Sequence, residues 1–325
     1  MKRLAALLFR PQYVLLWVFL AMVMFFCVAA PSFRSASNLI RAVKSSSVIA
    51  VMVLGLTWIV ASGEIDVSFP SVAGLASVVT ALAVENGVPW IAAPFLGIAA
   101  GTVFGLLSGF LIATFRCPSL IATIAIGSIA TGVACIIAGG YAPVRLTSTA
   151  GIVDTLGSGG IIVQLVWIAI VGGVYLAFRY IQDQTTTGQH LYALGENRQA
   201  SLEAGIREKK IIMSFFSLSA MLASCGGVVW VLFYAQGVPR MEGTVFIDGM
   251  TAVFLGALVV KAGKPNVIGT FIGAVFLAVL TNGLTPIGLQ DYIGSMIKGA
   301  LMIFGVVIIA ISKYRVTKKA SAEGR

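Results

Sequence analysis

The sequence predicts an all-α fold, a polytopic transmembrane helical bundle of about ten spans with the N- and C-termini in the cytoplasm. Hydrophobic residues make up 58% of the 325 residues and charged residues only 10%. A soluble domain carries roughly a quarter charged residues. The apolar residues form continuous runs without the alternation of barrel strands, so helices are favoured over a barrel. The composition therefore excludes a soluble domain and favours a protein embedded in lipid.

The predicted spans are the apolar runs that can cross, or nearly cross, a hydrocarbon core, which takes about 20 helical residues. The first run follows basic residues, as in a signal peptide, but it is as long as a span and we expect it to be retained. We also expect residues 1–325 to form a single transmembrane domain. The runs are 13–30, 47–62, 71–84, 91–114, 119–138, 161–179, 211–234, 248–262, 266–285 and 290–311.

Basic residues orient the spans, because Lys and Arg are enriched on the cytoplasmic side of membrane proteins. They precede the first run and follow the last, which places both ends of the chain inside. The net charge of +10 is thus a topology signal, and nucleic-acid binding is not expected. A minority of basic residues falls outside, facing either an acidic partner or lipid headgroups: Arg34, Arg41, Lys44, Arg145 and Arg240.

Small residues predict close helix packing. Gly97, Gly101, Gly105 and Gly109 recur every four residues, which puts them on one helix face.

The cysteines Cys27, Cys117, Cys135 and Cys225 lie in or beside apolar runs without a CxxC pair, which favours buried free thiols over disulfides. No metal site, cofactor or catalytic motif is expected, since the sequence contains no phosphate loop, HExxH or GxSxG.

The longest polar passage, YALGENRQASLEAGIREKKI, lies in a loop predicted to be cytoplasmic, about residues 180–210. Asn197 is a suitable cap for a helix from about Arg198 to Gly205, and Gly205 suits its C-terminus. A short helix held between two spans can present side chains to a cytoplasmic partner. A solvated connector is the alternative interpretation.

The segment GENRQASLEAGI resembles the coupling loop of ABC importer permeases, and more closely that of the ribose/xylose-type sugar permeases. Their loop follows the pattern G-x-N-x-x-A-A-x-x-x-G-I, and here Ser201 replaces the second Ala. The stretches SGEIDVSFPSVAGLASVV, FRCPSLIATIAIGSIATG and FIDGMTAVFLGALVVKAGKPNVIG are also similar to this family, so the resemblance covers nearly the whole chain. The sequence departs from the family at Glu64, Pro70, Ala257 and Pro265.

The resemblance implies a permease subunit, not an enzyme, that imports a monosaccharide or related small sugar across the bacterial inner membrane. It implies a second permease copy or a sister permease, an extracytoplasmic binding protein docked at the outer basic residues, and an ABC ATPase pair that hydrolyses ATP inside. Permeases for nucleosides or branched-chain amino acids, an ion-coupled secondary transporter and an intramembrane enzyme are the alternatives. The residues expected to couple to the ATPase are Gly195, Asn197, Ala200, Glu203 and Gly205.

Polar residues within the spans are candidates for the substrate pathway. The two short runs 47–62 and 71–84 are separated by SGEIDVSFPS, and broken helices often line a cavity at membrane depth. A turn that holds two helix ends is the alternative for its acids. Lys298 is expected to pair with a carboxylate in the bundle or to reach the interface, and Asp248 is a weaker pathway candidate. The pathway candidates are Glu64, Asp66, Ser68, Thr123 and Asn282.

Overall fold

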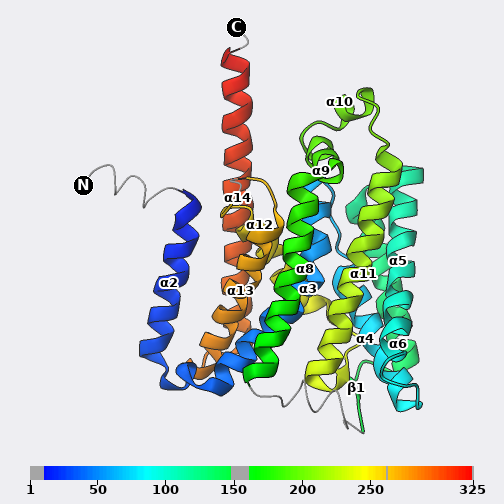
Figure 1. Ribbon diagram of the computed structural model, residues 1–325, viewed down its shortest axis with the longest axis vertical. Helices are drawn as coiled ribbons and strands as arrows, with labels where there is room; N and C mark the ends of the chain where they lie inside the picture. The colour runs from blue at the N-terminus through cyan, green and yellow to red at the C-terminus, as the bar shows by residue number, and fades with distance from the viewer. Residues whose placement is uncertain (1–10, 148–160, 261–262, 324–325) are drawn as a thin grey trace.

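Long apolar helices dominate the computed structural model, which describes residues 11–147, 161–260 and 263–323 (Figure 1). In these ranges, seven helices are long and apolar enough to cross a membrane, and three shorter apolar helices accompany them. The helices are α2 (Pro11–Ala29), α3 (Ala36–Ala61), α4 (Phe69–Glu85), α5 (Ala93–Phe115), α6 (Ser119–Ala138), α8 (Ile161–Gln184), α9 (Thr186–Glu196), α10 (Arg198–Glu203), α11 (Glu208–Tyr234), α12 (Glu242–Gly256), α13 (Val267–Leu284) and α14 (Asp291–Glu323).

Short elements join the helices at their ends. The 3-10 turns are η1 (Pro31–Arg34), between α2 and α3, and η2 (Thr285–Ile287), which follows α13. Strands β1 (Val144–Arg145) and β2 (Gln236–Gly237) form an antiparallel pair in which Val144 lies opposite Gly237. The all-α class is therefore confirmed for the described residues.

The predicted runs correspond to helices, but some predicted bounds were wrong. The run at 47–62 is no short span, since α3 begins at Ala36 and contains 26 residues. The Ser35 side chain caps it by accepting a hydrogen bond from the Asn38 N–H at 3.2 Å. Its polar first turns hid this extension, because a helix can continue beyond the apolar stretch that the bilayer requires. Helix α4 does remain short at 17 residues, and the total of ten spans stays a prediction.

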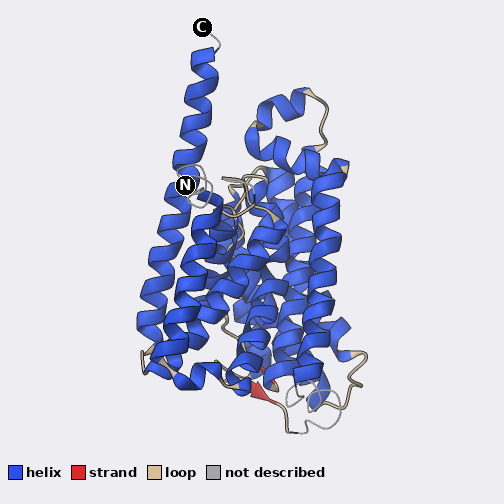
Figure 2. Cartoon of the chain, turned by 60° about the vertical axis from the view of Figure 1, so that its left-hand side comes forward, coloured by secondary structure: helices blue, strands red, loops and turns tan. Residues whose placement is uncertain are grey.

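The bundle has two distinct ends. The Pro11 end of α2 and the Glu323 end of α14 both point to the side that carries α9 and α10 (Figure 1), which we call the α10 face. The strand pair and the connections that follow α2 and α13 lie at the opposite end, the β1 face (Figures 1 and 2). The arrangement agrees with two chain ends on one side of a membrane, and its assignment as cytoplasmic remains a prediction.

Close glycine packing holds the first half of the bundle together. A Cβ atom on Gly101 would lie 2.0 Å from Ser224 Oγ, and one on Gly105 would lie 2.2 Å from the Cβ of Ala220. The predicted glycine face of α5 is thus confirmed, and it packs against α4 and α11. In the second half, a Cβ on Gly273 would lie 2.2 Å from the carbonyl oxygen of Ala252, so α12 and α13 approach in the same way.

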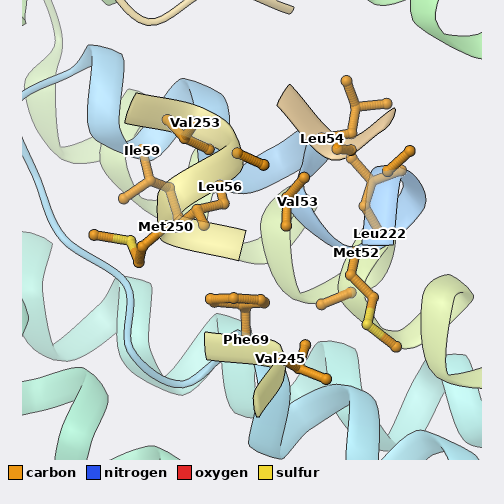
Figure 3. Packing of buried hydrophobic residues seen from close by; sticks show 14 of the residues in the cluster. Met52, Val53, Leu54, Leu56, Ile59, Phe69, Leu222, Val245, Met250 and Val253 are labelled. Atoms are coloured by element: carbon orange, nitrogen blue, oxygen red, sulfur yellow. The ribbon is translucent and has the colours of Figure 1, made fainter. Parts of the chain in front are cut away.

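Helix α3 lies at the centre of the core. Its residues Met52 to Ile59 pack with Phe69 of α4 and with side chains of α11 and α12 (Figure 3). By contrast, only 17% of the residues in the most apolar 18-residue stretch of α8, and of α14, are buried, so these two helices are peripheral.

The four cysteines are free thiols, as predicted, but they are half-buried and not buried.

Candidate coupling and transport sites

Helix α10 forms as the sequence predicts. Asn197 is its N-cap, and its Oδ1 accepts a hydrogen bond from the Ala200 N–H at 3.0 Å. The Ser201 hydroxyl donates to the Asn197 carbonyl oxygen at 2.8 Å. The helix ends at Glu203, and Gly205 follows in the left-handed region with φ +82°. That conformation favours glycine, which explains the residue type at this position.

The loop that carries α10 rests directly on the end of α3. A Cβ atom on Gly195 would lie 2.1 Å from the carbonyl oxygen of Ala61, which no side chain could tolerate without movement. The neighbouring Gly63 has φ +86° and approaches the Cα atom of Gly195. Gly195 therefore allows the close contact between the loop and α3.

Arg198, the first residue of α10, joins three parts of the chain. Its Nη1 donates to Glu64 Oε1 at 2.9 Å, and its Nη2 pairs with Glu208 at the start of α11. The side chains of Glu64 and Glu208 are only 10% and 15% exposed. Burial alone would lower the pKa of Arg198, but the hydrogen bonds and negative charges of Glu208 and Glu64 outweigh it and raise that pKa. Arg198 thus ties α10 to the segment after α3 and to α11.

The remaining surface of α10 is open to a partner. Ala200, Leu202, Glu203 and Gly205 are exposed, and the Gln199 Nε2 group donates to Glu203 Oε1 at 3.0 Å. The exposed surface is partly apolar, since it includes Ala200 and Leu202, as suits contact with another protein. The predicted coupling residues thus fall into two sets: Gly195 and Asn197 shape the loop, whereas Ala200, Glu203 and Gly205 face outward.

Residues 62–68 run from the α10 face into the bundle without helical structure. The backbone N–H of Ile65 donates to Ser119 Oγ, and that of Val67 donates to Thr123 Oγ1, both at 3.1 Å. Non-helical backbone at membrane depth needs such partners, because lipid offers none. The hydroxyl groups at the start of α6 therefore stabilise the 62–68 segment in an extended form.

Asp66 lies at the inner end of this segment and is 1% exposed. Its Oδ1 accepts from the Ser68 N–H at 2.8 Å and from the Ser68 hydroxyl at 2.6 Å, while its Oδ2 accepts from Ser219 of α11 at 3.3 Å. A carboxylate beside the N-terminus of α4 is favoured by the helix dipole. Asp66 therefore holds Ser68, the N-cap residue of α4, and connects it with α11.

An open groove of about 440 Å³ runs along α6. Val67 and Thr123 line its inner part, and Ser128 and Thr131 line its middle. Tyr141, Arg240 and Glu242 line the part that lies toward the β1 face. Of the predicted pathway residues, Thr123 lines the groove, whereas Asp66 and Ser68 lie beside it in the protein interior.

The other polar candidates lie apart from the groove. Glu64 contacts α10 through Arg198, which matches the alternative of a turn that holds helix ends. Asn282 donates to Ser45 Oγ at 2.9 Å and to the Ala278 carbonyl oxygen at 2.8 Å. Lys298 pairs with a carboxylate in the bundle, one of the two alternatives, and the structure identifies it as Asp248 of α12, whose Oδ1 lies 2.8 Å from Lys298 Nζ. Across the described residues, no group of three His, Cys, Asp or Glu side chains could hold a metal ion.

The five outer basic residues do gather toward the β1 face (Figure 1). Lys44 is half-buried, with its Nζ 5.7 Å from the centre of the Phe233 ring, and the other four are exposed. Arg240 lies over the Tyr141 ring at 5.2 Å, and its Nε lies 3.5 Å from Glu242 Oε1.

Three partners of the candidate residues were not predicted, because no local pattern marks them. They are Glu208, which pairs with Arg198, Ser119, which accepts from Ile65, and Ser219, which donates to Asp66.

Comparison with known proteins identifies the family. Residues 38–306 match the family model described as branched-chain amino acid transport system / permease component. The ribose import permease protein RbsC of Escherichia coli is 30% identical over 281 residues, which cover 86% of this chain and 87% of the relative. The protein of the same name from Haemophilus influenzae is 28% identical, over 93% and 94%. The autoinducer 2 import system permease protein LsrD of Photorhabdus temperata is 24% identical, over 90% and 89%.

No solved structure matches the chain. The match to the family model spans more than half of the sequence, and it includes α10, the 62–68 segment and the groove. The chain therefore belongs to the family of branched-chain amino acid transport system permease components, and it is similar to ribose import permeases over most of its length.

Proposed function

We propose that this permease is the transmembrane subunit of an ATP-driven importer in the bacterial cytoplasmic membrane and that its cargo is a monosaccharide or a related small sugar. The observation that carries the proposal is the exposed α10 helix, which Arg198 joins to two parts of the bundle. The relatives named for ribose and autoinducer 2 import support a sugar cargo. The subunit itself needs no cofactor, because a separate ATPase pair hydrolyses ATP.

In this proposal the ATPase pair docks on the exposed surface of Ala200, Glu203 and Gly205. Movement of α10 pulls on Glu64 and Glu208 through Arg198. The 62–68 segment and α11 meet again at Asp66, which binds Ser68 at the start of α4. A displacement of α10 is thereby transmitted to the helices beside the groove. The movement of these helices changes the side of the membrane from which the cargo can reach the groove.

The groove along α6 is one wall of the proposed pathway, and a second permease copy or a sister permease supplies the other wall. The hydroxyl groups of Ser128 and Thr131 can exchange hydrogen bonds with the hydroxyl groups of a sugar, whereas Thr123 is buried and its hydroxyl already binds the Val67 N–H and the Ser119 carbonyl oxygen. An extracytoplasmic binding protein releases the sugar at the β1 face, where Arg34, Arg41, Lys44, Arg145 and Arg240 attract an acidic docking surface. Membrane lipid covers the exposed apolar residues of α8 and α14.

A branched-chain amino acid is the second candidate cargo, and the description of the family favours it. Uptake of labelled D-ribose and L-leucine by the same membrane vesicles separates the two. An ion-coupled secondary transporter is disfavoured, because Asp66 would have to bind the ion. Its carboxylate is 1% exposed and already accepts three hydrogen bonds.

The substitution Gly205→Arg tests the coupling surface. No neighbouring atom lies within 4 Å of the position of a Cβ on Gly205, so the new side chain has room, while the left-handed backbone adds strain of about 1–2 kcal/mol. Gly205→Asn is the matched control, because Asn tolerates the left-handed conformation and adds no long cation. We expect Gly205→Arg to reach the membrane but to lose both the co-purified ATPase and sugar uptake, whereas Gly205→Asn keeps both.

Normal uptake by Gly205→Arg would contradict the assignment of α10 as the coupling helix. A purified preparation without an ATPase that still transports in a proton or sodium gradient would contradict the ATP-driven importer as a whole.

A further inference from the structure

A cavity of about 280 Å³ lies inside the bundle, among α3, α11, α12, α13 and α14. It shares no lining residue with the groove along α6. Thr285, Leu289 and Gln290 line it and are exposed, so it opens at the connection between α13 and α14 on the β1 face. Pockets for drug-sized ligands measure roughly 300–1,000 Å³, so this volume suits a molecule of one small ring.

The floor of the cavity carries the ion pair of Asp248 and Lys298, whose side chains are 11% and 9% exposed. Ionisable groups within membrane-spanning helices are costly and mark functional sites by default. The contact of 2.8 Å joins two charges, and it uses one carboxylate oxygen and one of the three ammonium donors. The pair therefore retains hydrogen-bonding capacity that hydroxyl groups of a ligand can use.

Two aromatic residues form one wall. Trp230 and Tyr234 lie one turn apart on α11, with ring centroids 4.6 Å apart, and both line the cavity. Trp230 Nε1 is buried and finds no acceptor among the residues that the structure describes. Trp58 and Trp167 also have unpaired indole N–H groups, but neither lines this cavity. An aromatic face beside an unused donor suits a ligand that is apolar on one face and polar at its edge.

Hydroxyl groups from α3, α13 and α14 also line the cavity. Ser45 donates to the Ala42 carbonyl oxygen at 3.2 Å and accepts from Asn282 at 2.9 Å, so its hydroxyl has a defined orientation. Thr281 and Ser295 line the cavity from α13 and α14. The site therefore combines an aromatic wall, a buried ion pair and hydroxyl groups in a space that holds one ring.

We propose that this cavity is a binding site for one free monosaccharide within each permease protomer. The apolar face of the sugar ring packs on Trp230 and Tyr234, and its hydroxyl groups bind Asp248 and Lys298. Asn282 acts as a positioning residue through Ser45. The inference rests on the proposed sugar cargo, and it adds a site separate from the groove in which the sugar is held after the binding protein releases it.

Protection of an introduced cysteine from alkylation tests this site. In the full transporter in membrane vesicles, the four native cysteines are replaced by Ser, and Thr281→Cys is introduced on the cavity wall. Ser128→Cys reports on the groove, and Asn86→Cys, an exposed position that lines neither hollow, is the matched control. The probes are D-ribose, D-xylose, D-glucose and D-galactose, with L-leucine as the non-sugar, and uptake of each is measured in parallel.

We expect the transported sugar to slow alkylation of Thr281→Cys several-fold and saturably, with no effect at Asn86→Cys. The protection disappears in Asp248→Asn/Lys298→Met, which removes both charges at once. A single substitution would leave an unpaired buried charge and endanger folding. Continued co-purification of the ATPase shows that the double variant is folded.

A sugar that is taken up but gives no protection at Thr281→Cys would overturn the cavity site and leave the proposed function intact. So would protection only at Ser128→Cys, or protection that survives in the double variant. If no sugar is taken up and none protects, the proposed cargo fails together with the site.

Discussion

Two ion-paired clusters join distant segments at opposite ends of the bundle, and they differ in their contact with water. At the α10 face, Arg198 pairs with Glu64 and Glu208 while its own side chain is 50% exposed. Toward the β1 face, Lys298 and Asp248 pair with side chains that are 9% and 11% exposed. The first cluster joins a surface helix to the bundle, and the second lies between two helices of the bundle.

The difference in solvation indicates different roles. Exposed ion pairs contribute about 0–1 kcal/mol, because water screens the charges and solvates them when they separate. Breaking a buried pair is far costlier, since the remaining charge stays without a partner. Arg198 can therefore exchange partners as α10 moves, whereas Lys298 and Asp248 keep α12 and α14 in place beside the cavity.

The largest effect is expected for Lys298→Ala. It leaves the Asp248 carboxylate buried without a counter-charge, which costs about 3–5 kcal/mol of stability. Asp248→Asn/Lys298→Met removes both charges and should recover most of that loss. Thermal unfolding of the purified transporter in detergent measures both variants. A loss below 1 kcal/mol for Lys298→Ala would show that water reaches the pair, and the contrast between the clusters would disappear.

A smaller effect on stability is expected for Arg198→Gln. Because the Arg198 side chain is half exposed, water can partly replace it beside Glu64 and Glu208, so its removal should cost less than Lys298→Ala, about 1–2 kcal/mol in the same assay. Glu64→Gln/Arg198→Gln should recover part of that loss, because only Glu208 then keeps a charge without its partner. Destabilisation as large as that of Lys298→Ala would mean that the Arg198 cluster is as rigid as the buried pair.

The smallest effect on stability is expected for Arg41→Glu/Arg240→Glu at the β1 face, where both side chains are exposed. The double reversal should leave unfolding and ATPase assembly unchanged but raise the KM for delivery by the binding protein, most strongly at low salt. Uptake at varied binding-protein concentration measures this. Arg179→Glu, on α8 near the α10 face, is the matched reversal and should leave KM unchanged. Unchanged delivery in Arg41→Glu/Arg240→Glu would exclude these residues from docking.

Local features of the fold were predictable from the sequence. The apolar runs predicted the helices. The spacing of Gly97 to Gly109 predicted the packing face of α5, and Asn197 predicted the start of α10. Each of these patterns acts within one helix, where neighbours in sequence are neighbours in space. The start of α3 was not predictable from hydropathy alone, because its first turns are polar.

The partners of the candidate site residues were not predictable. Glu64 and Asp66 lie in one short polar stretch, but the extended backbone sends one side chain to Arg198 and the other to Ser219. These partners lie 134 and 153 residues away in the sequence. Such contacts depend on how whole helices pack, and no spacing rule within one segment encodes them.

The most direct test of the coupling role of Arg198 compares ATP hydrolysis and sugar uptake in the reconstituted Arg198→Gln transporter. The account predicts that the ATPase still assembles and hydrolyses ATP, while uptake per ATP falls by about tenfold, a loss within the usual range of coupling free energies. Uptake per ATP equal to that of the unmodified transporter would contradict the transmission of movement from α10 through Arg198 to the bundle.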